Sequence, residues 1–328
     1  MTDRTVEGPY EFTEPPAELT GWLQLDSARE FELIAGTDAD PTEGYDLYLM
    51  RAAQRLARFG LEDITSPESL RIWDYAEQVT GKHLKTWRQL IGDCVSHGNA
   101  MAWNVGQVAE IARFYQEEKF RAAFPPYFYG MGRTAPDLGN GKLGNGDGST
   151  GIWGAGAMRK YGCLFCDDQN VPTYSADVAK TWGRKPGPPS WARELAKDNL
   201  TGKTAKLTAL KQVRHELINR RPVTMAIMYD FGMKPIEYKG HHVFKRGKVV
   251  GGHQVCLTEW QDEPFEGAYL QGSWGPNAHG RPLNGEQPGG AWVREADLDY
   301  HLGRGQYSEF FAMSLLQGHP GPANPSIL

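Results

Sequence analysis

The spacing of apolar residues changes about two thirds of the way along this chain of 328 residues. Up to about residue 220 they recur every three or four positions, which is the period of a helix, over 45–59, 94–120 and 208–219. Beyond it they alternate or run over strand lengths, at 223–229, 253–260, 267–271, 291–294 and 309–315. A helical half followed by a half of antiparallel strands predicts an α+β fold.

The composition is that of an ordinary soluble globular protein, with 40% apolar and 23% charged residues. The net charge of −5 gives no general reason to expect nucleic acid as a partner. No apolar run is long enough to span a bilayer, and the first residues lack the pattern of a secretory signal. We therefore expect no membrane partner and a cytoplasmic protein that a signal peptide does not export. The four cysteines predict no disulfide framework.

The N-terminal region differs in charge from the rest. Residues 1–45 contain eleven Asp or Glu and two Arg. Within residues 1–80 a helix is expected over 45–59 and another from Ser66, ending before Gly81. We expect residues 1–80 to form an acidic arm and helical extension suited to contacts with other subunits of an assembly.

Cys94 begins the strongest predicted helix of the chain. It follows Asp93, a possible N-cap, and small residues and a regular apolar stripe continue to about residue 120. A helix N-terminus lowers the pKa of a thiol, and the thiolate is the nucleophile. A lone cysteine in such a place is more often a packing residue, so the residues that accompany it decide between the two interpretations.

Two segments far downstream accompany Cys94. His253 follows a pair of glycines and opens an apolar strand, 159 residues after the cysteine. Gly272-Ser273-Trp274-Gly275 follows at the end of another strand. A thiol and a histidine in this order are typical of cysteine nucleophiles whose proton is taken by an imidazole.

In this order of segments the chain resembles the papain-like cysteine peptidases, and most of all their divergent members in bacteria and tailed phages. The matching segments are Gly92-Asp-Cys-Val-Ser-His-Gly, Gly151-Ile-Trp-Gly-Ala-Gly, Leu210-Lys-Gln-Val-Arg-His-Glu-Leu, Gly252-His-Gln-Val, Gly272-Ser-Trp-Gly and Gly289-Gly-Ala-Trp-Val. The resemblance implies a two-lobe domain over 81–320. Its helical lobe would cover about 85–205, and its antiparallel, β-barrel-like lobe about 206–316.

The resemblance also assigns roles to residues. Cys94 would be the nucleophile, and His253 the general base that later protonates the leaving amine. Gln89 would donate its side-chain amide to the oxyanion. Trp274 would cover the histidine, and Trp153, Gly154 and Trp274 would bind substrate. The partner would be a peptide or protein substrate.

This sequence departs from the family pattern at two positions. The family glutamine lies six residues before the cysteine, where Arg88 stands here, and Gln89 lies five before it. The family's Asn-Ser-Trp-Gly is Gly-Ser-Trp-Gly here, so the amide that orients the histidine is missing at Gly272. The alternation of side chains along a strand is expected to point the neighbouring Gln271 toward the other face, unless a bulge intervenes.

No cofactor or metal is expected. Cys163 and Cys166 have the spacing of a zinc or redox pair, but a second pair of ligands at a matching spacing is missing. The glycine-rich run at 139–149 lacks the glycine and glutamate of a calcium loop.

Two functional hypotheses follow. The first is a papain-like peptidase that hydrolyses peptide bonds through an acyl-enzyme at Cys94. The second is a catalytically impaired papain-like fold that serves as a structural or binding subunit of a phage virion. The missing amide at Gly272 and the acidic arm motivate the second.

Overall fold

A computed structural model describes residues 19–23, 68, 70–114, 119–201 and 204–313. The expected helix at 45–59 and most of the proposed extension lie outside these residues. Helix α3 spans Ile72–Thr80 and ends at Gly81, whose φ of 75° is the left-handed conformation that glycine adopts readily. The helix therefore ends where the sequence predicts, although it begins only at Ile72.

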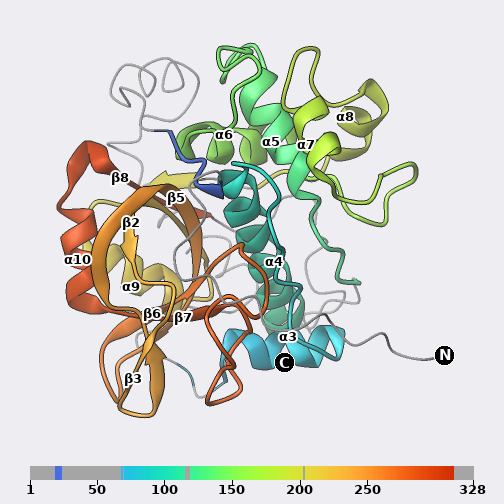
Figure 1. Ribbon diagram of the computed structural model, residues 1–328. Helices are drawn as coiled ribbons and strands as arrows, with labels where there is room; N and C mark the ends of the chain where they lie inside the picture. Colours follow the sequence, from blue (N-terminus) through green and yellow to red (C-terminus); the bar gives the residue numbers. More distant parts are fainter. Residues whose placement is uncertain (1–18, 24–67, 69, 115–118, 202–203, 314–328) are drawn as a thin grey trace.

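Helix α4, Cys94–Phe114, runs through the middle of the molecule beside the sheet (Figure 1). Helices α5 (Pro125–Thr134), α6 (Gly151–Tyr161), α7 (Ala176–Trp182) and α8 (Ser190–Ala196) gather on one side of it. Helix α5 corrects the expectation that 124–151 is irregular throughout. Its two prolines lie in the first turn, where no backbone N–H is needed, and every residue of the helix is buried. Packing therefore stabilises a helix that the sequence does not predict, because two glycines lower its helix propensity.

Residues 204–313, the described part of the second half, form an eight-stranded sheet in the order β1-β8-β2-β5-β6-β7-β4-β3, in which only β4 and β7 pair in parallel. The strands are β1 (Thr204–Lys206), β2 (Val223–Phe231), β3 (Ile236–Tyr238), β4 (His241–Val243), β5 (Arg246–Gln261), β6 (Gly267–Gln271), β7 (Gly290–Arg294) and β8 (Ser308–Met313). Helices α9 (Leu210–Ile218) and α10 (Glu295–Leu302) accompany the sheet, and a short 3₁₀ turn, Gly305–Tyr307, precedes β8. The sheet does not close into a barrel. The α+β prediction is confirmed.

The buried apolar residues of the described part of the chain form two large cores and two smaller clusters. One large core joins helices α3 to α8, and it includes the large buried rings of Trp103 and Trp153. The other joins the sheet to helices α9 and α10, and it includes Tyr229, Trp260 and Trp274. Strand β5 belongs to both, because its alternate side chains turn to opposite faces: Cys256 lies in the helical core, and Val255 and Leu257 lie in the sheet core.

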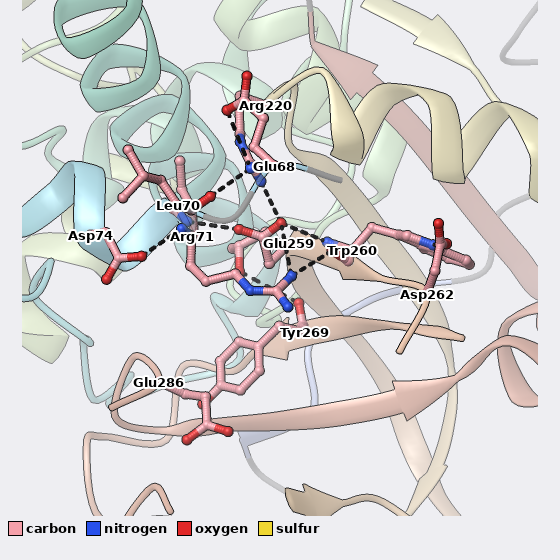
Figure 2. Close-up of polar contacts among 12 residues, drawn as sticks. Glu68, Leu70, Arg71, Asp74, Arg220, Glu259, Trp260, Asp262, Tyr269 and Glu286 are labelled. Carbon is pink, nitrogen blue, oxygen red and sulfur yellow. Dashed lines mark hydrogen bonds and ion pairs between the residues drawn. The ribbon is translucent and has the colours of Figure 1, made fainter. Parts of the chain in front are cut away.

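A buried ion-pair network fastens α3 to the sheet (Figure 2). Glu259 of β5 is fully buried and accepts hydrogen bonds from the guanidinium of Arg220 and, at 2.7 Å, from the backbone N–H of Ile72. Arg220 also donates to the carbonyl oxygen of Leu70 at 2.6 Å. Arg71 lies 3.9 Å from the same carboxylate. Burial raises the pKa of Glu259, and Arg220 opposes that shift. The network therefore holds α3 and the residues just before it against strand β5.

Candidate active site

Cys94 is the first residue of α4 and is fully buried where the helix meets the sheet. The backbone N–H of Gln254 on β5 donates to its Sγ at 3.5 Å. The Gln254 side chain donates to the carbonyl oxygen of Val95 and to Oδ1 of Asn99, at 3.2 and 3.0 Å. The helix N-terminus and the middle of β5 are therefore held together around the sulfur.

Residues 19–23, which we call the strap, cross the molecule at this point (Figure 1, the short blue segment near one end of α4). The N–H of Trp22 donates to the carbonyl of Gly252 at 3.1 Å. On the other side, the N–H of Leu23 donates to the carbonyl of Ser149, and the N–H of Ser149 donates to the carbonyl of Gly21, both at 2.7 Å. Backbone hydrogen bonds to both halves of the fold thus hold an extended peptide across Cys94.

The strap leaves little free space. A methyl group on Gly21 would lie 1.9 Å from the carbonyl oxygen of Gly92, so only glycine fits there. The Trp22 ring packs in a small cluster with Cys94, Val95 and Ala226. Its indole N–H donates to Oε2 of Glu309 at 2.8 Å, and the same oxygen accepts from the backbone of Gly151 at 2.9 Å.

Gln89 is oriented by Ser273, whose hydroxyl donates to its Oε1 at 2.5 Å. The amide nitrogen consequently turns toward backbone carbonyls and donates to Leu19 at 2.7 Å and to Ile91 at 2.9 Å. One of these acceptors belongs to the strap. The side chain predicted to bind an oxyanion therefore already donates to a peptide carbonyl, and the oxyanion role stays a prediction.

His253 lies on β5 beside the residue that contacts Cys94, and none of its surface is exposed. Its ring stacks on Trp274 at 4.2 Å between centroids and 14° between planes, and the ring of Tyr229 meets its edge at 5.3 Å. Neither ring nitrogen has a hydrogen-bond partner among the described residues. Trp274 thus lies against one face of the His253 ring, and its role in substrate binding stays a prediction.

The other two predicted substrate-binding residues, Trp153 and Gly154, lie in the first turn of α6. Trp153 is buried in the helical core. A methyl group on Gly154 would lie 2.0 Å from the amide of Asn99, so this glycine lets α6 approach α4 closely. The backbone that holds the strap belongs instead to Ser149, just before α6, which the sequence reasoning missed. The role of Trp153 and Gly154 in substrate binding stays a prediction.

The departure at Gly272 is clarified by its neighbours. The amide of Gln271 donates to the hydroxyl of Thr86 and to the carbonyl of Pro288, at 3.1 and 2.9 Å, so it faces away from the site, as the strand alternation predicts. The ring of His279 lies beside Gly272: a Cβ there would be 3.4 Å from its Nε2. The sequence reasoning did not single out His279, because it lies in an irregular loop with no recognisable motif.

A polar cluster lies behind the nucleophile. Asp93 is buried and accepts a hydrogen bond from the hydroxyl of Tyr174 at 2.9 Å. The Nε2 of His97 lies 3.3 Å from the same Asp93 oxygen. The carboxylate of Asp93 therefore contacts Tyr174 and His97, although the sequence suggested Asp93 as the cap of the helix.

Burial dominates the electrostatics. It raises the pKa of Cys94 to about 12, and the backbone N–H groups of Gln254 and Gly21 oppose that shift only in part. It lowers the pKa of His253 to about 3, with a smaller contribution from His279. With the strap in place, Cys94 is therefore a neutral thiol and His253 a neutral imidazole.

Within the described part of the chain, no group of three or more His, Cys, Asp or Glu side chains could hold a metal ion. Cys163 and Cys166 are free thiols. Across the same residues, no helix is long and apolar enough to cross a membrane.

Comparison with known proteins identifies the fold. No family model matches the sequence, and no curated protein does either. Among solved structures, xylellain, a cysteine protease from Xylella fastidiosa, is similar over 76% of this chain and 90% of its own, with a TM-score of 0.50 and 14% identity. Procathepsin B from Trypanosoma congolense matches 75% of this chain and 77% of its own, with a TM-score of 0.48 and 10% identity. Bromelain from Ananas comosus, solved with the inhibitor E64, matches 76% and 99%, with a TM-score of 0.47 and 9% identity.

The similarity to xylellain agrees with the order of elements around Cys94. A central helix begins at the cysteine, further helices pack on one side, and a mostly antiparallel sheet carries the histidine. The tryptophan that stacks on the histidine follows strand β6. The chain has the papain-like fold of the cysteine proteases.

Proposed function

We propose that this protein is a cysteine peptidase whose nucleophile is Cys94 and whose general base is His253. The observation that carries the proposal is the strap. An extended peptide lies across Cys94 and is held by backbone hydrogen bonds to Ser149 on one side and Gly252 on the other. Backbone recognition of this kind accepts many side chains, as a peptidase cleft must.

In the reaction, a substrate peptide takes the place of the strap. The thiol proton of Cys94 passes to a ring nitrogen of His253, the sulfur attacks the peptide carbonyl, and the amide of Gln89 and the N–H of Cys94 stabilise the oxyanion. The same histidine then protonates the leaving amine, and water releases the acyl group. With the strap in place, the pKa shifts of Cys94 and His253 oppose the first step, so the chain is latent until the strap leaves.

The test is turnover of an unfolded, fluorescently labelled polypeptide by three versions of the full chain: unchanged, Gly21→Ala, and Gly21→Ala with Cys94→Ala. We expect cleavage to rise in the first variant, because a side chain at Gly21 displaces the strap, and to vanish in the second. Cleavage that survives Cys94→Ala would refute the assignment of the nucleophile.

The alternative of a structural subunit in a phage assembly stays a prediction, since most of residues 1–80 lie outside the described part of the chain. A folded Gly21→Ala variant that binds unfolded polypeptide but never cleaves it would favour that alternative.

A further inference from the structure

The ring of His279 occupies the space beside Gly272 where an orienting side chain would stand. A Cβ on Gly272 would lie 3.4 Å from the Nε2 of His279, and the φ angle of Gly272 is not in the left-handed region. The backbone could therefore carry a side chain at this position. The imidazole of His279 fills part of the space into which that side chain would extend.

The tautomer of His279 is fixed by its surroundings. Its Nδ1 lies 2.9 Å from the carbonyl oxygen of Met233. A carbonyl oxygen can only accept, so Nδ1 carries the hydrogen and donates it. Burial keeps the ring neutral by lowering its pKa to about 4. The Nε2 of His279 is then a hydrogen-bond acceptor, the same role that an amide oxygen plays.

His253 and His279 belong to one buried aromatic cluster. Both rings pack on Trp274, with centroid distances of 4.2 Å for His253 and 5.9 Å for His279. The Nε2 of His279 and both nitrogens of His253 are buried and lack a hydrogen-bond partner. After burial, the strongest influence on the pKa of His253 comes from His279. Unpaired buried donors and acceptors are costly, which favours their pairing when the rings adjust.

We propose that His279 is the positioning residue of this site: its Nε2 accepts a hydrogen bond from one ring N–H of His253 and replaces the amide that Gly272 lacks. The other ring nitrogen of His253 is then the acceptor that takes the proton of the Cys94 thiol. In that step the S–H bond breaks, an N–H bond forms on His253, and His279 keeps its own single proton. This role rests on the proposed peptidase function.

Trp274 adds a competing donor, because its indole nitrogen is also buried without a partner. A hydrogen bond from Trp274 to His279 would leave His253 without orientation. The experiment must therefore detect the proton on His253 itself, apart from any effect on activity.

The first measurement is the NMR spectrum of the full chain labelled with ¹⁵N-histidine, with His253→Asn used for assignment. We expect a ring N–H signal of His253 that is protected from solvent exchange. In His279→Phe, which keeps an aromatic ring but has no acceptor, that signal should be lost. In His279→Ala with Gly272→Asn it should return, because the removed ring leaves room for the amide. A signal that persists in His279→Phe, or its absence from the unchanged chain, would overturn the proposal.

The second measurement is turnover in the Gly21→Ala background. Orientation contributes part of the roughly 10²- to 10⁴-fold that acid–base catalysis provides, so His279→Phe should lower kcat by about 10- to 100-fold with KM little changed. The amide at position 272 should restore most of the loss in His279→Ala. The matched control is His301→Phe, which removes another buried ring, bonded to Asp230 at 3.0 Å, without touching His253.

Equal losses of kcat in His279→Phe and His301→Phe, with no rescue by Gly272→Asn, would overturn the positioning role. Absence of turnover in every variant would instead overturn the peptidase function, and the positioning role with it. In that case the NMR signal would still show whether His253 donates to His279. Failure of the positioning role and failure of the peptidase function are therefore distinguishable.

Discussion

Gly21 controls access to the thiol of Cys94. An added methyl group would lie 1.9 Å from the carbonyl oxygen of Gly92 and 2.3 Å from its carbonyl carbon. Both atoms belong to the backbone just before α4, so they cannot rotate away. Gly21→Ala should therefore lift the strap from Cys94, while the two main cores, to which Gly21 does not belong, stay intact.

The size of the effect follows from the state of the thiol. With a pKa of about 12, the ionised fraction of Cys94 at pH 8 is about 10⁻⁴. An exposed thiol with a pKa of about 8.5 is roughly one quarter ionised at the same pH. Only the thiolate reacts, so lifting the strap should speed alkylation by about 10³-fold from ionisation alone. Steric access adds to this figure.

The assay is the rate of iodoacetamide modification at pH 8, followed by peptide mass spectrometry. Cys166, which is partly exposed, is the internal reference, and Cys163 and Cys256 are buried. Gly247→Ala is the matched control, because a methyl group there meets nothing closer than 3.9 Å. If Gly21→Ala keeps the native melting temperature and its Cys94 reacts no faster than in the unchanged chain, the strap does not control the thiol.

Three further predictions concern single groups. Trp22→Ala should also speed alkylation of Cys94. Trp22→Phe should speed it less, because phenylalanine keeps the packing against Cys94 and loses only the hydrogen bond to the carboxylate of Glu309. Equal alkylation rates in the two variants would contradict this. Glu259→Ala should lower the free energy of unfolding in urea by about 3 to 5 kcal/mol, because the buried guanidinium of Arg220 loses the fully buried carboxylate that it pairs with. A loss below about 1 kcal/mol would show that the network is not stabilising. Burial lowers the pKa of His253 to about 3 and of His279 to about 4. Below about pH 6.5 the unfolded chain therefore binds more protons at these two residues than the folded chain does. The free energy of unfolding should be highest above about pH 6.5 and fall as the pH falls toward 3. His279→Phe should show a shallower fall in urea titrations across that range, and an unchanged slope would contradict the assignment.

The sequence predicted most of the helices and strands, and the reason is local. The apolar residues of α4 and of β2, β5, β6, β7 and β8 recur with the period of a helix or a strand, because most of these side chains point into one of the two large cores. Helix α5 was missed because Gly130 and Gly132 lower the helix propensity of a segment that tertiary packing nevertheless buries completely. Predicted boundaries also shifted, as at Ile72, because helix ends depend on what they dock against.

The sequence by itself determined the order of the chemical groups: a cysteine at a helix start, a histidine on a later strand, and a tryptophan after a glycine where an amide was expected. The spacing of apolar residues near each group is sufficient to place it on a helix or a strand, because the helix and strand periods are properties of neighbouring residues. The tertiary structure alone decided what surrounds those groups. Backbone hydrogen bonds across more than 100 positions bring the strap over Cys94, and the fold brings His279 beside Gly272. Such contacts follow from long-range packing, which no local pattern records.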